Sequence, residues 1–94
     1  MRLRPETEAD RETVRRVIEA AFGREDEAHL VERLHEEGDA AISLVAEIDG
    51  RIAGHVMFSP MRSPEGALGL APVSVRPDLH GNGIGGALIR EGLD

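Results

Sequence analysis

The sequence predicts an α/β (α+β) fold in which a sheet is flanked by helices, with the elements in the order β-α-α-β-β-β-α. Three observations predict it. Two segments with apolar residues at helical spacing follow a short first strand, Asp49-Gly50 joins two apolar strands, and a glycine-rich stretch separates a last strand from a last helix. The 94 residues allow one domain at most.

The first element is a short extended segment, residues 2–4, which Pro5 stops. Thr7 and Asp10 then have the spacing of a capping box, which marks a helix start. The helix that follows has one apolar stripe at helical period, formed by Val14, Val17, Ile18, Ala21 and Phe22. Gly23 is expected to end this helix, because glycine adopts the left-handed conformation of a helix C-terminus without steric cost.

A second helix is predicted over Asp26–Glu37, with Gly38 closing it. Its inward-facing residues are expected to be Leu30, Val31 and Leu34. The pair of helices resembles a helix–turn–helix only in outline. A second helix that reads DNA is basic, whereas this one carries Glu27, Glu32, Glu36 and Glu37.

Two strands are predicted over Ala41–Ile48 and Arg51–Phe58, joined at Asp49-Gly50 by a type I′ turn. Strict alternation assigns one face of the first strand to Ile42, Leu44 and Ala46 and the other to Ala41 and Val45. It assigns one face of the second strand to Ile52, Val56 and Phe58 and the other to Ala53 and Met57. Because both faces are apolar, we expect helices on both sides of the sheet.

A loop is predicted over Ser59–Gly66, and a further strand over Leu68–Val75. Pro72 lies within this strand and cannot donate to a ladder, so it marks an edge, a bulge or a break in pairing. The glycine-rich stretch His80–Gly86 follows, and Ala87–Leu93 has helix-forming character.

The composition argues against several classes of function. The formal net charge of −7 disfavours nucleic acid as a partner. No apolar run approaches the roughly 20 residues of a membrane span, and the N-terminus lacks an apolar signal core, so we expect a cytoplasmic protein without membrane contact. The chain contains no cysteine, and its histidines are not clustered in sequence, so no metal site is expected; they are His29, His35, His55 and His80.

The stretch Val73–Leu88 carries the chemistry, because a glycine-rich loop that opens a helix is suited to binding phosphate through backbone N–H groups. A Walker A loop is excluded, because the chain has no lysine. The three glycines of the dinucleotide-binding fingerprint G-x-G-x-x-G are present as Gly81, Gly83 and Gly86. However, residues 76–80 separate it from its strand, and the required acidic residue about 20 positions later is missing.

The remaining design is the acetyl-coenzyme A loop of the GNAT superfamily, whose motif reads Val-x-Pro-x-x-Gln/Arg-x-x-Gly-x-Gly/Ala. The sequence resembles this motif at every spacing over Val75-Arg76-Pro77-Asp78-Leu79-His80-Gly81-Asn82-Gly83-Ile84-Gly85. The departure is His80, where the family usually has glutamine or arginine. The order of the upstream elements is also similar to that of the family, so the resemblance covers essentially the whole chain.

The resemblance implies a GNAT-like mixed, mostly antiparallel sheet flanked by helices, truncated before the C-terminal strands, so that residues 1–94 form a single incomplete domain. It implies acetyl-coenzyme A as cosubstrate and transfer of its acetyl group to an amine, on a small molecule or a peptide. The residues implied in cofactor binding are Val73, Ser74, Val75, His80, Gly81, Asn82, Gly83, Ile84, Gly85 and Gly86.

Catalytic residues stay unassigned. The family commonly protonates the leaving thiolate with a tyrosine, and this chain has none. The acceptor substrate and the activity of the 94 residues by themselves are therefore open. Two alternatives to an enzyme remain, a coenzyme A-binding remnant without activity and a small α/β interaction module. We expect His55 to be a packed, hydrogen-bonded core residue, and we expect an open edge at the last strand to favour self-association.

Overall fold

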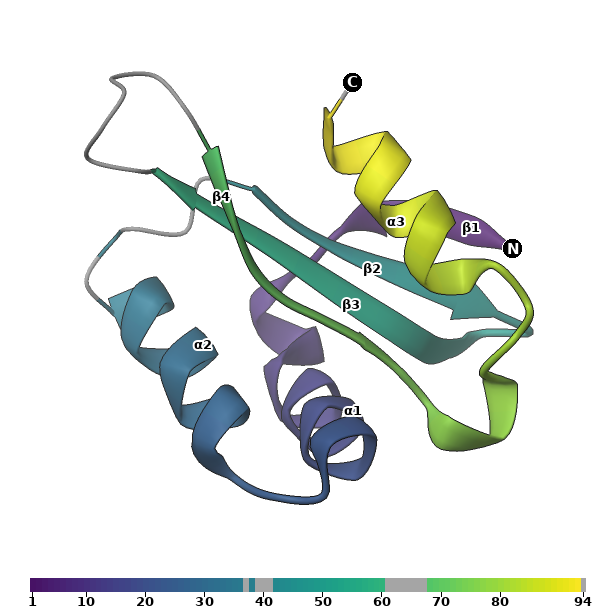
Figure 1. Ribbon diagram of the computed structural model, residues 1–94, viewed down its shortest axis with the longest axis horizontal. Coiled ribbons are helices and arrows are strands. Elements are labelled where there is room, and N and C mark those ends of the chain that lie inside the picture. The colour runs from purple at the N-terminus through teal and green to yellow at the C-terminus, as the bar shows by residue number, and fades with distance from the viewer. Residues whose placement is uncertain (37, 39–41, 61–67, 94) are drawn as a thin grey trace.

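The computed structural model describes residues 1–36, 38, 42–60 and 68–93, and its elements follow the predicted order (Figure 1). The strands are β1 (Arg2–Pro5), β2 (Ile42–Ile48), β3 (Arg51–Pro60) and β4 (Leu68–Val75). The helices are α1 (Arg11–Phe22), α2 (Asp26–Glu36) and α3 (Ile84–Leu93), with short 3-10 turns at Glu8–Asp10 and Pro77–Leu79. The predicted strand start at Ala41 and most of the predicted loop lie outside the described residues.

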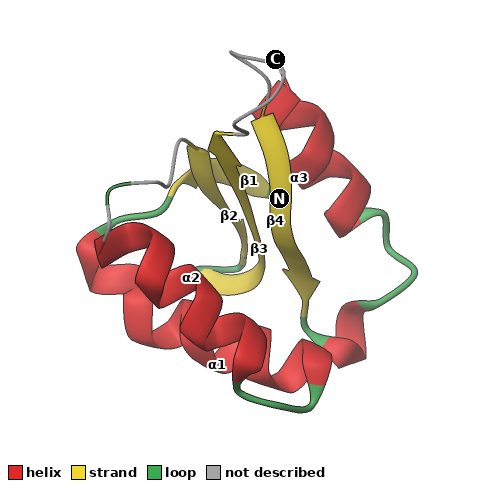
Figure 2. Cartoon of the chain, turned by 60° about the vertical axis from the view of Figure 1, so that its left-hand side comes forward, coloured by secondary structure: helices red, strands yellow, loops and turns green. Residues whose placement is uncertain are grey.

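The described strands form one sheet in the order β1-β2-β3-β4, and each neighbouring pair is antiparallel. Helices α1 and α2 cover one face of the sheet and α3 covers the other, as the edge-on view in Figure 2 shows. The sheet is therefore the middle of three layers, which confirms the expectation from its two apolar faces.

The local turn and cap signals are confirmed. The amide and the hydroxyl of Thr7 both donate to Asp10 Oδ2, at 2.8 and 2.9 Å. Gly23 has φ of +70°, and its N–H donates to the Glu19 carbonyl at 2.8 Å. Asp49 and Gly50 have φ values of +52° and +78°, as a type I′ turn requires.

A guanidinium connects the first strand to two other elements. Arg4 donates to both carboxylate oxygens of Asp10, at 2.7 and 3.0 Å, and to Glu47 Oε2 at 3.1 Å. Hydrogen bonds from Arg4 hold the pKa of Asp10 well below its usual range. The start of α1 and strand β2 are thus both tied to β1.

The core between the sheet and the two N-terminal helices contains eight buried side chains: Val14, Val17, Ile18, Ala28, Val31, Val45, Ile52 and Met57. The prediction for α2 was wrong in one residue. Leu30 is 43% exposed, and Ala28 is buried instead. The inward face of α2 is set by its close packing against α1, where Ala28 and Val31 are one turn apart and the larger Leu30 lies to one side.

The predicted faces of β3 were also wrong at Ile52 and Ala53, its second and third residues. Ile52 packs with Val45 and Met57, whereas Ala53 packs with Val56 and Phe58 on the α3 side. The cause is a bulge, because Ala46 pairs with Gly54 and the next residue of β2 pairs with Ile52. Ala53 is the extra residue, and one extra residue reverses the alternation on one side of it.

The α3 side of the sheet depends on a close approach of helix to strand. Ile84 and Leu88 of α3 are both buried against β3. A Cβ on Gly54 would lie 3.0 Å from the Ser74 carbonyl oxygen and 3.1 Å from Ile84 Cγ2. Pro72 lies where β4 has an extra residue relative to β3, so its predicted role at a bulge is confirmed.

We therefore predict that Gly54→Ala destabilises the fold, by about 1–3 kcal/mol, because the added methyl meets a backbone oxygen and two core side chains. The matched control is Gly85→Ala, whose Cβ would make only ordinary contacts, at 3.6 and 3.8 Å. It is expected to be neutral or slightly stabilising, because alanine favours helix over glycine. Urea unfolding of both variants tests this, and equal stability of Gly54→Ala and the unsubstituted chain would contradict it.

Candidate functional site

The glycine-rich loop begins where β4 ends, and hydrogen bonds hold both of its ends. The Arg76 N–H donates to the Ala53 carbonyl at 2.9 Å, so the end of β4 is fixed by the bulged residue of β3. After the 3-10 turn, Gly81 and Gly83 have φ values of +87° and +74°. Glycine adopts these left-handed conformations without steric cost, whereas other residues adopt them only with strain.

Helix α3 begins at Ile84, three residues before the predicted start at Ala87. Glycine is a weak helix former, which suggested a later start, but burial of Ile84 and Leu88 offsets that cost. The first intrahelical bond of the helix runs from the Ala87 N–H to the Gly83 carbonyl, at 3.0 Å. The first-turn amides before Ala87 therefore have no acceptor within the helix, which makes this helix end suitable for an anion.

Two residues of this first turn, Ile84 and Gly85, line a hollow of about 440 Å³ between the C-terminal end of α1, strand β4 and the loop. The hollow brings together seven of the ten residues implied in cofactor binding: Val73, Val75, His80, Gly81, Gly83, Ile84 and Gly85. Strand β4, at the edge of the described sheet, forms one wall of it. The hollow therefore combines backbone donors at one end with apolar strand residues at the other.

The other three residues do not line this hollow. The Ser74 side chain is buried, and Ser74 pairs with His55 across the two strands. Asn82 instead closes the loop, since its Nδ2 donates to the Leu79 carbonyl at 2.9 Å. A side chain on Gly86 would meet Arg90 rather than the hollow.

His80, which departs from the family motif, also has a local role. Its Nε2 lies 2.9 Å from the carbonyl oxygen of Val75, so this nitrogen donates back to the end of β4. The ring consequently stabilises the turn from strand to loop, and only Nδ1 remains for other contacts.

Three lining residues were missed by the sequence reasoning, Leu79 of the second 3-10 turn and two residues of α1. Ala21 and Phe22 border the hollow, and Phe22 is 40% exposed although its stripe predicted burial. They occupy the last turn of α1, which extends past the covered part of the sheet. In the sequence, Ala21 and Phe22 continue the helical spacing of the buried residues before them, so nothing there indicates that they line a hollow.

A second polar centre lies on the opposite face of the sheet, around the carboxylate of Glu6. Glu6 Oε1 lies 2.5 Å from Ser43 Oγ, 3.1 Å from His35 Nε2 and 3.2 Å from His55 Nε2. His55 is fully buried and its Nε2 also lies 2.8 Å from Ser43 Oγ, so the expectation of a packed, hydrogen-bonded histidine is confirmed.

Burial of Glu6 would by itself raise the pKa of this carboxyl. Hydrogen bonds from His55 and Ser43, together with the charges of His55 and His35, outweigh that effect and lower the pKa from 4.5 to about 2. Glu6 is thus an anion held by three donors. Two buried atoms close to this centre, His55 Nδ1 and Ser74 Oγ, have no hydrogen-bond partner among the described residues.

Two further findings concern the described residues alone. No group of three or more histidine, cysteine, aspartate or glutamate side chains there has an arrangement that could hold a metal ion. None of the described helices is both long enough and apolar enough to cross a membrane.

Comparison with known proteins relates this fold to one family. Residues 8–94 match the model of the acetyltransferase (GNAT) family. The uncharacterized N-acetyltransferase YjhQ of Escherichia coli K12 is 39% identical over 94 residues, which cover 92% of this chain and 51% of that protein. The uncharacterized N-acetyltransferase YhbS of the same strain is 35% identical over 98 residues, covering 100% and 59%. The chain spans about half the length of the curated relatives it matches.

Two solved structures have the same fold. The crystal structure of a GNAT family acetyltransferase from Brucella melitensis in complex with acetyl-CoA has a TM-score of 0.92 at 44% identity, covering 98% of this chain and 65% of that one. The crystal structure of YhbS from Escherichia coli in complex with CoA has a TM-score of 0.91 at 33% identity, covering 99% and 54%.

The cluster around Glu6 predicts a specific pH dependence of stability. Because the pKa of Glu6 is lowered in the fold, its stabilisation is complete above pH 4.5 and is lost as the pH falls toward 2. The full effect is at most about 3 kcal/mol. Glu6→Gln should therefore be less stable than the unsubstituted chain at pH 7, and this difference should shrink below pH 4.5.

Urea unfolding at several pH values measures the difference. The control is Glu8→Gln, an exposed neighbour that should change stability little at any pH. A difference between Glu6→Gln and the unsubstituted chain that stays constant from pH 7 to pH 3 would show that Glu6 is not held as an anion.

Proposed function

Because the chain belongs to the GNAT family of acetyltransferases, we propose that the hollow beside β4 binds acetyl-coenzyme A. We propose further that the chain supplies the coenzyme-binding part of an N-acetyltransferase, which transfers the acetyl group to an amine. The observation that carries this proposal is that Gly81, Gly83 and the first-turn residues Ile84 and Gly85 of α3 line one hollow, with positive φ at both loop glycines.

The pyrophosphate is assigned to the loop end of the hollow. Amides without a helical acceptor and the positive end of the α3 dipole favour a negative group there. Positive φ at Gly81 and Gly83 turns successive N–H groups toward a common point, as in a nest. This way of holding an anion needs no lysine, which suits a chain with a net charge of −7.

The pantetheine arm is assigned to the open edge of β4. An edge strand presents unpaired N–H and C=O groups, to which the amides of an extended ligand can bind as an added strand does. Val73 and Val75 offer apolar contacts along the same wall. In this arrangement an N–H near Val73 stabilises the oxyanion that forms when an amine attacks the thioester carbonyl. A base accepts the proton of the amine, and we assign no residue to this role.

The proposal predicts that the chain binds acetyl-coenzyme A more tightly than NAD. Gly83→Val should weaken acetyl-coenzyme A binding by at least about tenfold, because valine strongly disfavours φ of +74° and shifts the amides of the loop. Gly50→Val is the matched control, because Gly50 has φ of +78° but lies in the turn between β2 and β3.

Calorimetry with both ligands and both variants is the test. Both substitutions introduce similar backbone strain, so only the Gly83 variant should lose affinity. Tighter binding of NAD, or an unchanged affinity in Gly83→Val, would refute the assignment.

We also propose that the chain self-associates through β4. Of the described strands, β4 is an outer one, and its residues Val73 and Val75 are only partly buried. Such an edge pairs with other strands unless it is protected. Sedimentation velocity should show a weight-average mass that rises with protein concentration and falls when acetyl-coenzyme A occupies the edge. A monomer at every concentration, with or without ligand, would contradict this proposal.

A further inference from the structure

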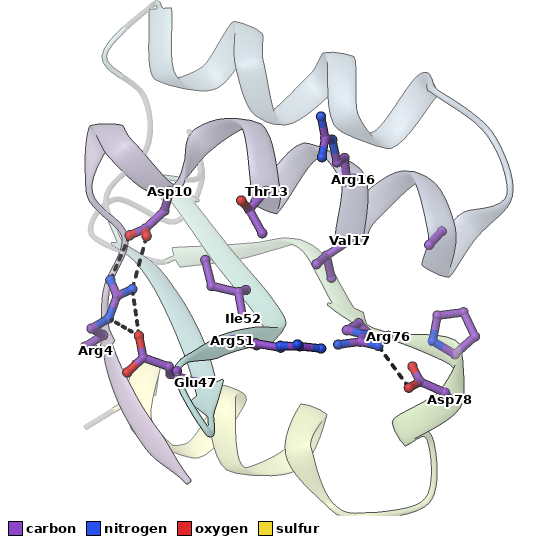
Figure 3. Close-up of a pocket in the computed structure, with 13 residues that line it drawn as sticks. Arg4, Asp10, Thr13, Arg16, Val17, Glu47, Arg51, Ile52, Arg76 and Asp78 are labelled. Atoms are coloured by element: carbon purple, nitrogen blue, oxygen red, sulfur yellow. Dashed lines mark hydrogen bonds and ion pairs between the residues drawn. The ribbon is translucent and has the colours of Figure 1, made fainter.

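A larger hollow, of about 680 Å³, lies between α1, the β2–β3 hairpin and the turn after β4 (Figure 3). It shares no lining residue with the hollow beside β4. Its floor is apolar, since Val17 of α1 and Ile52 of β3 are 5% and 8% exposed. A hollow of this size is within the range that small organic ligands occupy.

The charges around this hollow differ from those of the whole chain. The lining contains four arginines but only three carboxylates, although the chain carries a net charge of −7. At one end, Asp10 and Glu47 are both bonded to Arg4, so three of these groups form one closed cluster. Arg16 is paired with Glu12, outside the lining, at 3.0 Å, so Arg51 and Arg76 are left with Asp78 as the remaining carboxylate of the lining.

Two of these arginines come together at the rim. Arg51 is the first residue of β3, and Arg76 follows the last residue of β4, with its N–H bonded to the Ala53 carbonyl at 2.9 Å. Both backbones are therefore held by the sheet. Their guanidinium groups point toward one another across the hollow (Figure 3).

Most of the donors on this pair are available. Arg76 Nη2 donates to Asp78 Oδ2 at 3.0 Å, and Arg51 has no hydrogen bond or ion pair within the part of the chain that the structure describes. A guanidinium has five N–H donors in a planar fork that matches the oxygens of phosphate and carboxylate. An oxyanion between the two groups would bond to both and relieve their mutual repulsion.

We propose that this hollow is a second binding site, separate from the coenzyme site, for a small organic oxyanion. Its phosphate or carboxylate group binds between Arg51 and Arg76, and its apolar part lies on Val17 and Ile52. The apolar floor distinguishes this ligand from a bare inorganic ion, which would leave most of the hollow unfilled.

Chemical-shift titration of the ¹⁵N-labelled chain is the test, with phenyl phosphate, benzoate and inorganic phosphate as probes at constant ionic strength. Phenyl phosphate should shift the signals of Gly50, Arg51, Ile52 and Arg76 saturably, with Kd of about 1 mM or below. Inorganic phosphate should bind at the same place but several-fold more weakly. If benzoate shifts the same signals, a carboxylate can take the place of the phosphate group.

Arg51→Gln and Arg76→Gln should each weaken phenyl phosphate binding by at least about tenfold. The matched control is Arg24→Gln, because Arg24 is exposed in the turn between α1 and α2 and should not alter the affinity. The spectra report folding at the same time. The site is independent of the coenzyme site, so Gly83→Val should keep phenyl phosphate binding, and Arg51→Gln should keep acetyl-coenzyme A binding.

The inference is overturned by any of three results. Phenyl phosphate shifts that map to Gly81–Gly85 would place the anion at the coenzyme loop. Equal affinities of phenyl phosphate and inorganic phosphate would mean that the apolar floor takes no part. An equal loss of affinity in the Arg24 and Arg51 variants would indicate unspecific attraction to positive charge.

Discussion

The bulge at Ala53 connects the sheet to both candidate sites. As the extra residue in β3, Ala53 reverses the alternation, so that Ile52 faces α1 while Ala53 itself faces α3. Its carbonyl also accepts the N–H of Arg76, which determines where β4 stops and the glycine-rich loop begins. Without the bulge, Ile52 would leave the floor of the arginine-lined hollow, and the end of β4 would lose its attachment to β3.

An acidic chain can bind anions in two physically different ways, and this fold contains both arrangements. The loop before α3 offers backbone N–H groups, whose direction depends on the left-handed conformations of Gly81 and Gly83. The hollow beside α1 uses charged side chains, two arginines held at strand ends. Elsewhere, carboxylates form ion pairs with arginines of the same chain, as Asp10 and Glu47 do with Arg4. The positive charge of the rim is therefore local rather than a property of the whole surface.

The buried centre at Glu6 shows what holds the N-terminal segment in place. Glu6 follows β1 directly, and its carboxylate is bonded to β2 through Ser43, to β3 through His55 and to α2 through His35. Arg4 makes a similar set of connections through Asp10 and Glu47. Arg4 and Glu6 thus fasten β1, which pairs with β2 at the edge of the described sheet, to helices and strands beyond its neighbour. A buried anion of this kind is stable only while its donors remain in place.

The sequence by itself determined the features that depend on neighbouring residues. These are the apolar stripe of α1, the left-handed end at Gly23, the turn at Asp49-Gly50, the glycine-rich loop and its family motif. Tertiary structure decided the rest. Whether Ala28 or Leu30 faces inward depends on how α2 packs on α1, and the faces of Ile52 and Ala53 depend on a register shift against β2. Phe22 lines the hollow beside β4, and Arg51 and Arg76 line one hollow, only because segments distant in sequence come together in the fold. Local conformational preference cannot encode such contacts, since each is set by a partner in another element of the fold.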